Sequence, residues 1–257
     1  MESETASHSA LIACLLEMGE LLLNCGAEIS RIEDTLARLG ASYGAERTDV
    51  FVIPSIISIS MEFPGEKALT ETRRIHSNGA NDFYRLEKLN TLSRGCHTEP
   101  LPLPELRASL DRIAAGRKPL RVILGGSVLA ALSFTVFFGG SVWDGLAAAL
   151  FALAVCLLQE YLGRTELNTT AFNLVISLLI GLGVGLLAAL LPALHMDKIL
   201  IGDIMLLIPG LAMTNAIRNM LVGNTISGVV RLAESLIWAA ALASGIMIAL
   251  VVVGVLF

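Results

Sequence analysis

A proline-glycine pair interrupts a long apolar stretch of this chain, and polar side chains follow it closely. Pro209 and Gly210 are followed within ten residues by Thr214, Asn215 and Arg218. Proline removes a backbone donor and clashes with the preceding helical turn, so backbone acceptors are left free there. A guanidinium beside amide and hydroxyl groups suits a carboxylate, which it can hold through two parallel N–H groups. We therefore expect a binding site for a small carboxylate at this break, with a simple helix kink as the structural alternative.

A second polar set lies a few turns further along the chain. Ser227, Arg231 and Glu234 recur at intervals of four and three, which places them on one face of a helix. We predict that Arg231 helps to bind the substrate and that Ser227 and Glu234 take part in coupling or gating. An ordinary ion pair between Arg231 and Glu234 is the alternative.

Isolated polar residues also lie inside other apolar segments. Asn173 needs a partner in hydrocarbon, either another helix or a ligand, and we count it with the substrate-binding residues. Asp203 is a lone acid in apolar surroundings, where it either couples transport to protons or lies at the membrane interface. Gly181 and Gly185, spaced by four, predict close packing between helices rather than a substrate role.

The elements that must position these residues divide into two parts. Residues 1–118 hold 13 of the 18 basic residues and 17 of the 23 acidic ones, although the whole chain is 54% hydrophobic. The first part reads as a soluble domain of ordinary size, and residues 119–257 read as a membrane domain. A bilayer core needs about 20 apolar residues per helix. The spans that meet this requirement are at about 120–138, 145–162, 169–191, 199–217 and 232–257.

Basic residues flank these spans on one side, against a single lysine, Lys198, on the other. The basic set is Arg117, Lys118, Arg121, Arg164, Arg218 and Arg231. Because positive charge favours the cytoplasmic side, we expect a multi-pass membrane protein with its N-terminus in the cytoplasm and its C-terminus on the far side of the membrane. The predicted fold class is an α-helical membrane protein, with five transmembrane helices preceded by a cytoplasmic α+β domain.

The N-terminal domain shows helical and extended patterns in turn. Ser30 and Glu33 form a capping-box pattern at the start of a helix. Pro54 breaks a stretch rich in Val, Ile and Ser that is typical of strands. We predict helices over residues 9–25, 30–43, 81–94 and 104–116, and extended structure over 49–63.

A charged cluster follows a glycine at the start of the second predicted helix. Glu28, Arg31, Glu33 and Asp34 are explained most simply as a solvated helix start. Glu28 and Arg31 are also candidates for a gating or regulatory contact.

Other kinds of chemistry find no support in the residues. The four histidines are scattered without metal-ligand spacing, and no phosphate-binding loop of the GxxxxGK[ST] type is present. No nucleophile and base can be paired, so we expect neither an enzyme nor a cofactor, and no metal. The net charge of -5 argues against a nucleic-acid partner.

Two stretches together resemble the threonine/serine exporter family. The run Ile208-Pro209-Gly210 through Thr214-Asn215-Ala216-Ile217-Arg218, then Gly223, Ser227-Gly228, Arg231 and Glu234, is similar to that family's signature. The stretch from Gly26 to Asp34 resembles its first motif, and the likeness runs from about residue 8 to the C-terminus. The chain departs from the pattern at Asn219 and Asn224, where the family often has acids.

The resemblance implies a secondary exporter of the bacterial inner membrane, with the C-terminus in the periplasm. Because the chain has five spans where fused members continue into a second half, it is similar to the large subunit of the split form. A small partner membrane subunit of inverted topology would then complete the transporter in the lipid membrane, and higher oligomers are compatible with this. The split form is associated with succinate and the fused form with threonine and serine, which stay the alternative substrates. A regulatory or scaffolding subunit, whose partner carries the substrate, is the other alternative.

Overall fold

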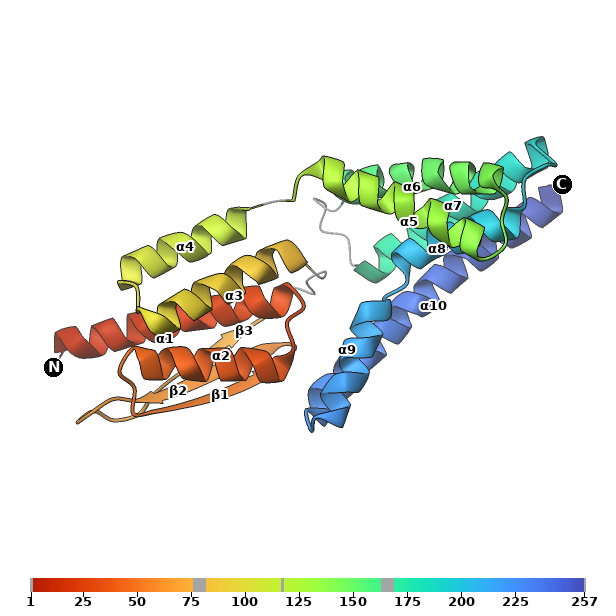
Figure 1. The fold of residues 1–257 in the computed structure, drawn as a ribbon. Coiled ribbons are helices and arrows are strands. Elements are labelled where there is room, and N and C mark those ends of the chain that lie inside the picture. The colour runs from red at the N-terminus through yellow and green to blue at the C-terminus, as the bar shows by residue number, and fades with distance from the viewer. Residues whose placement is uncertain (1, 76–81, 117, 163–168, 257) are drawn as a thin grey trace. The chain divides into compact units, whose positions relative to one another are not determined.

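The computed structural model describes residues 2–75, 82–116, 118–162 and 169–256, and the chain forms two compact units (Figure 1). The first unit joins Met1–Arg117 with Leu211–Leu232, and the second joins Lys118–Gly210 with Ala233–Phe257. The predicted domain boundary at residue 118 stays a prediction. What the contacts add is that the segment just after the Pro-Gly pair belongs with the N-terminal unit.

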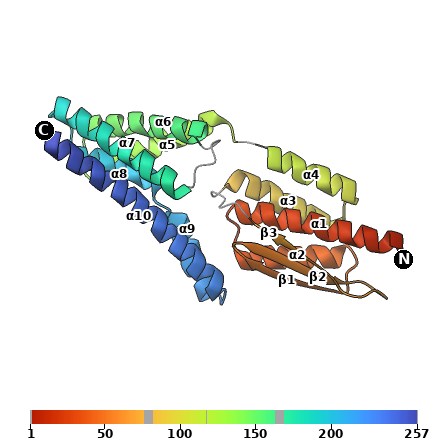
Figure 2. The same ribbon diagram turned by 180° about the vertical axis from the view of Figure 1, so that it is seen from behind.

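The N-terminal part of the first unit has two helices, a three-stranded sheet and two further helices. In chain order these are α1 (Glu2–Asn24), α2 (Ile29–Ser42), β1 (Arg47–Ile53), β2 (Ile56–Glu62), β3 (Leu69–Arg74), α3 (Phe83–Thr98) and α4 (Leu103–Ala115). The strands lie in the order β1-β2-β3 and pair antiparallel throughout. Seen from behind in Figure 2, the sheet lies on one side of α1 and α4 lies on the other.

The sheet has one apolar and one polar face, as expected when successive side chains alternate. Ile57, Ile59 and Met61 of β2 are fully buried. On the opposite face, the hydroxyls of Ser60 and Thr70 form a cross-strand hydrogen bond of 2.8 Å. Among the described residues, helices cover the apolar face of the sheet.

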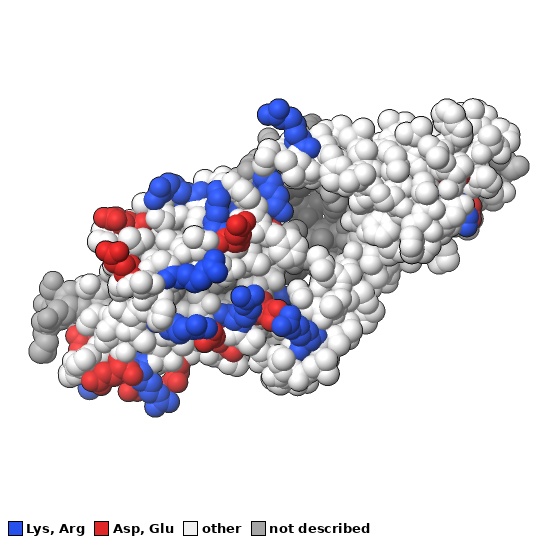
Figure 3. All heavy atoms as spheres, viewed as in Figure 1, with Lys and Arg blue, Asp and Glu red and all other residues white. Residues whose placement is uncertain are grey.

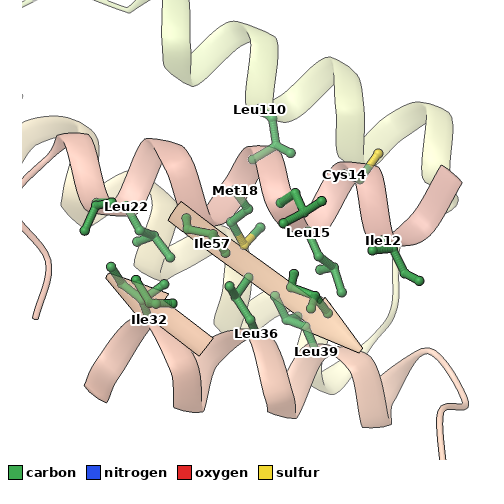
Figure 4. Packing of buried hydrophobic residues seen from close by; sticks show 14 of the residues in the cluster. Ile12, Cys14, Leu15, Met18, Leu22, Ile32, Leu36, Leu39, Ile57 and Leu110 are labelled. Atoms are coloured by element: carbon green, nitrogen blue, oxygen red, sulfur yellow. The ribbon is translucent and has the colours of Figure 1, made fainter. Parts of the chain in front are cut away.

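Helix α1 lies between α4 on one side and α2 with the sheet on the other, and its apolar side chains pack against both. Leu15 and Met18 point toward Leu36 of α2 and Ile57 of β2, while Leu110 of α4 packs from the other side (Figure 4). Burying a side chain of this size contributes about 1.5–3 kcal/mol. By length and hydropathy α1 could also cross a membrane, yet half of that stretch is buried inside the unit.

One prediction about this unit is wrong, and one strand was not predicted. The capping box at Ser30 does not form, because α2 begins at Ile29 after an N-cap at Glu28 that makes no side-chain cap bond. The carboxylate of Glu33 instead accepts a hydrogen bond from the backbone N–H of Val52. Strand β3 was not predicted at all, since its residues alternate between half-buried and exposed and include no buried apolar run.

The second unit is built almost entirely from apolar helices. Its elements are α5 (Leu120–Phe137), α6 (Val142–Leu162), α7 (Thr169–Leu190), α8 (Met196–Leu207) and the later part of α10 (Thr225–Leu256). Helix α9 (Gly210–Leu221) lies between α8 and α10 in the chain and belongs, from Leu211, to the first unit. Charged side chains gather over the first unit in Figure 3, whereas the visible face of the second is nearly free of them.

The chain is a helical membrane protein by the length and apolarity of these helices. Besides α1, the helices α5, α6, α7 and α10 are each long enough and apolar enough to cross a membrane, and α8 with α9 passes as one bent pair. These elements correspond to the five predicted spans. Helix α10 begins at Thr225, earlier than the predicted 232, and its 32 residues extend about 48 Å.

Close packing holds α7 against α10. A Cβ added at Gly181 would lie 2.5 Å from the Cβ of Ala249, and one at Gly185 would lie 2.6 Å from a methyl of Val253. Both contacts are with α10. The prediction that these glycines serve helix packing is confirmed.

Candidate functional site

A tight turn after α1 places Glu28 at the start of α2. Gly26 has a positive φ of 85°, and the N–H groups of Gly26 and Ala27 donate to the carbonyls of Leu23 and Leu22. This double bond pattern ends a helix with a left-handed residue, which glycine adopts without strain. Because Glu28 makes no capping bond, its carboxylate is available for another partner.

The Pro-Gly pair ends one helix and starts another, as predicted. Ile208 is extended, with φ −62° and ψ 129°, and α9 begins at Gly210. A residue before proline is driven out of the helical region by contact with the proline ring. On α9, Leu211, Asn215 and Arg218 follow at intervals of four and three, so they share one helical face.

A second glycine turn returns the chain from α9 into α10. Gly223 has a φ of 94°, and the N–H of Asn224 donates to the carbonyl of Asn219 at 2.8 Å. Gly228 in the first turns of α10 lies against α9, where an added Cβ would be 2.7 Å from the carbonyl oxygen of Ala216. The two helices therefore pack closely beside the turn.

An ion pair joins the two sequence motifs. The guanidinium of Arg218 lies 2.6 Å from the carboxylate of Glu28, and their side chains are 60% and 20% exposed. An exposed pair of this kind contributes only about 0–1 kcal/mol. Most of the Arg218 guanidinium is open, and a competing carboxylate could displace Glu28 at little cost.

A cavity of about 320 Å³ lies beside this pair, between α2, α3 and α9. Glu28, Arg31 and Asn215 line it, together with Leu211 and the half-buried Asn90. Its lining thus includes one carboxylate, one guanidinium, two amides and the hydroxyl of Thr35, among mostly apolar residues. The cavity volume is in the usual range for a site that binds a small molecule.

The structure brings four of the predicted residues to one place and leaves the others elsewhere. Glu28, Arg31, Asn215 and Arg218 form the site just described. Thr214, on an exposed part of α9, and Ser227 and Arg231, on α10, are outside the cavity lining but in the same unit. The second unit holds Asn173, Asp203, Pro209, Gly210 and Glu234.

Asp203 is fully buried in α8. Its side chain is 0% exposed, and neither carboxylate oxygen has a hydrogen-bond partner among the described residues. Asn219 of α9 is also buried, and its amide nitrogen has no partner within the same described ranges. Asn173 is half-buried on α7. Unpaired polar atoms at such positions mark places where a proton or a ligand group could bind.

A second buried acid, Asp144, was missed by the sequence analysis. Its carboxylate accepts hydrogen bonds from the backbone N–H and hydroxyl of Ser141, both at 2.8 Å. It also accepts the backbone N–H of His195 at 2.7 Å and faces the ring Nδ1 of that histidine at 3.0 Å. The spacing of Ser141 and Asp144 is a capping-box pattern that could have revealed the first half. Nothing in the sequence pointed to His195.

The remaining acids of the N-terminal cluster face other partners. Asp34 pairs with Arg38, one turn later on α2. Burial raises the pKa of Glu33 above its ordinary value, and the hydrogen bond from Val52 opposes that shift. Glu33 therefore ties α2 to β1 and takes no part in the cavity. Within the described ranges, no group of three His, Cys, Asp or Glu side chains could hold a metal ion.

Comparisons with known proteins agree on one family. The sequence model of the family described as "Putative threonine/serine exporter" matches residues 13–253. The "Probable succinate transporter subunit YjjP" of Klebsiella aerogenes is 24% identical over 258 residues, which cover 99% of this chain and 98% of that protein. The protein of the same name from Escherichia coli K12 is 22% identical over 254 residues, covering 98% of each chain. No solved structure matches the chain significantly.

Proposed function

We propose that this chain, which belongs to the putative threonine/serine exporter family, is the larger subunit of a secondary transporter that exports small carboxylates, with succinate as the leading substrate. The observation that carries the proposal is the contact between Glu28 and Arg218 beside a cavity of about 320 Å³. Relatives named as subunits of a succinate transporter support both the substrate and the need for a partner.

In this proposal, Arg218 is the residue that receives the carboxylate. A guanidinium can hold a carboxylate through two parallel N–H groups. The single ion pair with Glu28 leaves other N–H groups of Arg218 available for a second carboxylate. The arriving anion would displace Glu28 from Arg218, with Asn215 as a further donor. Release of Glu28 would break the ion pair that joins α2 to α9. We propose that this change opens or closes the substrate path, and that this is the gating role of Glu28 and Arg31.

Coupling to protons is assigned to Asp203. An ionised carboxylate buried without a donor is costly, whereas a protonated one is tolerated. Asp203 has that environment, since both its oxygens lack partners among the described residues. Proton uptake at Asp203 from the outer side, exchanged for an outgoing anion, would drive export. Pro209, Gly210, Thr214, Arg231, Asn173, Ser227 and Glu234 stay candidates for the substrate path and its gating.

The proposed setting is the bacterial inner membrane, with the N-terminal unit in the cytoplasm. The bias of basic residues toward one side of the spans supports this orientation. A small membrane subunit of inverted topology would supply the second half of the transport path.

A regulatory subunit is the second candidate, because two described cavities lie in the first unit. In that case the partner subunit alone would carry succinate in vesicles.

The direct test replaces the arginine of the site. Cells in which Arg218→Ala is the only source of this chain should lose succinate export while the protein still reaches the membrane. The matched control is Arg47→Ala, which removes another exposed arginine whose guanidinium pairs with a carboxylate, that of Asp49 at 2.9 Å. Normal export by Arg218→Ala would overturn the assignment, whatever the control does.

A further inference from the structure

A larger cavity lies on the N-terminal unit, in the groove between α2 and α3. It measures about 450 Å³ and is lined on the α2 side by Arg31 and Arg38, and on the α3 side by Arg94 and His97. Arg38, Arg94 and His97 do not belong to the site described above. The groove therefore gathers cationic side chains from two helices around a space large enough for a small molecule.

The charges in this groove do not balance. Arg38 is neutralised by Asp34 through an ion pair along α2. Arg31 and Arg94 have no salt bridge to any carboxylate within the described ranges, and Glu87 is the other acid of the lining. Three guanidinium groups thus face two carboxylates, which leaves an excess of positive charge. Figure 3 shows Lys and Arg side chains over this face of the first unit, with Asp and Glu side chains among them.

The groove is continuous with the cavity beside Arg218. Both cavities are lined by Arg31, Thr35, Phe83, Leu86 and Asn90. Arg31 therefore belongs to the lining of both cavities.

The two ends of the groove are separated along α2. Arg38 lies seven residues beyond Arg31, two turns along the same face of the helix, which is about 10 Å. Ser42 near the end of α2 contacts the ring of His97 at 2.8 Å, which fixes the far end of the groove. The outer set, Arg38, Arg94 and His97, is therefore about two helical turns away from the end that meets α9.

We propose that the groove between α2 and α3 is a second binding site for the anions of small carboxylic acids, which takes up the substrate before Arg31 passes it to Arg218. The proposal rests on the proposed function for the identity of the anion. Two unpaired guanidinium groups in a concave surface raise the local concentration of anions. A neutral zwitterion gains less there, because the excess charge of the groove attracts one of its ends and repels the other.

The first test isolates the groove from the site at Arg218. Purified full-length chain carrying Arg218→Ala is titrated with labelled succinate, and binding should persist. Adding Arg94→Gln should weaken that binding about tenfold, since a charge-assisted hydrogen bond is lost. Adding Arg112→Gln instead should change nothing, because Arg112 lies outside the groove lining and its side-chain hydrogen bonds among the described residues go to Ala108 and Ser109 of its own helix, α4. Absence of binding to the Arg218→Ala chain, or equal binding of threonine, would overturn the proposal.

The second test separates this proposal from the proposed function. In export assays, Arg94→Gln alone should raise the succinate concentration for half-maximal export about tenfold and leave the maximal rate unchanged. An unchanged half-maximal concentration would contradict the proposed role of the groove. It would not contradict the proposed role of Arg218 in export. If instead no variant and no wild-type chain exports succinate, the proposed function fails, and the binding titration still reports on the groove.

Discussion

Asp144 and Asp203 are both fully buried acids of the second unit, and their surroundings are opposite. The Asp144 carboxylate receives hydrogen bonds from Ser141 and from the backbone of His195, with the histidine ring beside it. Asp203 receives none from the described residues. Neither side chain is exposed to solvent, and the hydrogen-bond donors around the two carboxylates differ.

This difference assigns different roles to the two acids. A carboxylate surrounded by donors is stabilised as the anion and fixes the loops that supply those donors. An acid without donors in an apolar place is stabilised when it takes up a proton. Glu33, outside the membrane helices, is an intermediate case: it is partly buried and receives one hydrogen bond, from Val52. We therefore interpret Asp144 as a structural residue and propose Asp203 as the residue that couples transport to protons.

The largest expected effect is at Asp203. Asp203→Asn keeps the shape of the side chain but cannot exchange a proton, so export driven by a pH gradient should fall to the level of cells that lack the chain. Exchange of labelled for unlabelled succinate across vesicles at equal pH should persist, because it needs no net proton movement.

Asp197→Asn is the control for this change, since Asp197 lies on the same helix with an exposed side chain. It should export normally. Gradient-driven export by Asp203→Asn at the wild-type rate would remove the proposed difference between the two buried acids.

The next effect is at Asp144 and concerns stability rather than transport. Asp144→Asn loses the charge that strengthens the bonds from Ser141 and His195, and we expect a loss of about 2–4 kcal/mol. The apparent melting temperature of the purified chain in detergent measures it. The folded fraction should still transport with normal coupling, and a loss of coupling without a loss of stability would reverse the assigned roles.

The smallest effect is at Glu33 and depends on pH. Burial raises the pKa of folded Glu33 above its ordinary value of 4.5, so its contribution favours folding below the unfolded pKa and is lost as pH rises through the folded one. Glu33→Gln removes this dependence. Relative to wild type, the variant should gain stability between about pH 4 and about pH 7, by at most about 1 kcal/mol. Melting curves at both pH values test this, and a difference that shrinks with rising pH would contradict it.

Much of the fold could be predicted because its signals are local. Apolar runs located the membrane helices, and Pro209 located the break after Leu207. The predictions were wrong or incomplete where one local sequence pattern is compatible with two structures. The pattern at Ser30 and Glu33 resembles a capping box, but β1 offers Glu33 a better partner in the backbone of Val52. The equivalent pattern at Ser141 and Asp144 does form.

The candidate site was predictable by residue but not by arrangement. Glu28, Arg31, Asn215 and Arg218 were each singled out from their types and spacing. That Glu28 pairs with Arg218 depends on the packing of α9 within the first unit, which no local pattern encodes. The groove at Arg94 could not be predicted for the same reason. Its charged residues come from two helices, and neither helix alone shows a pattern that indicates a binding site.

The most direct measurement is uptake into inverted membrane vesicles that contain this chain and its small partner subunit. With the vesicle interior acidified, labelled succinate should accumulate in wild-type vesicles, unlabelled succinate should compete and threonine should not. Vesicles with Arg218→Ala should match vesicles that lack the chain. Three results would contradict the account. They are uptake that is unchanged in Arg218→Ala vesicles, uptake that threonine suppresses as well as succinate does, and uptake by the partner subunit alone.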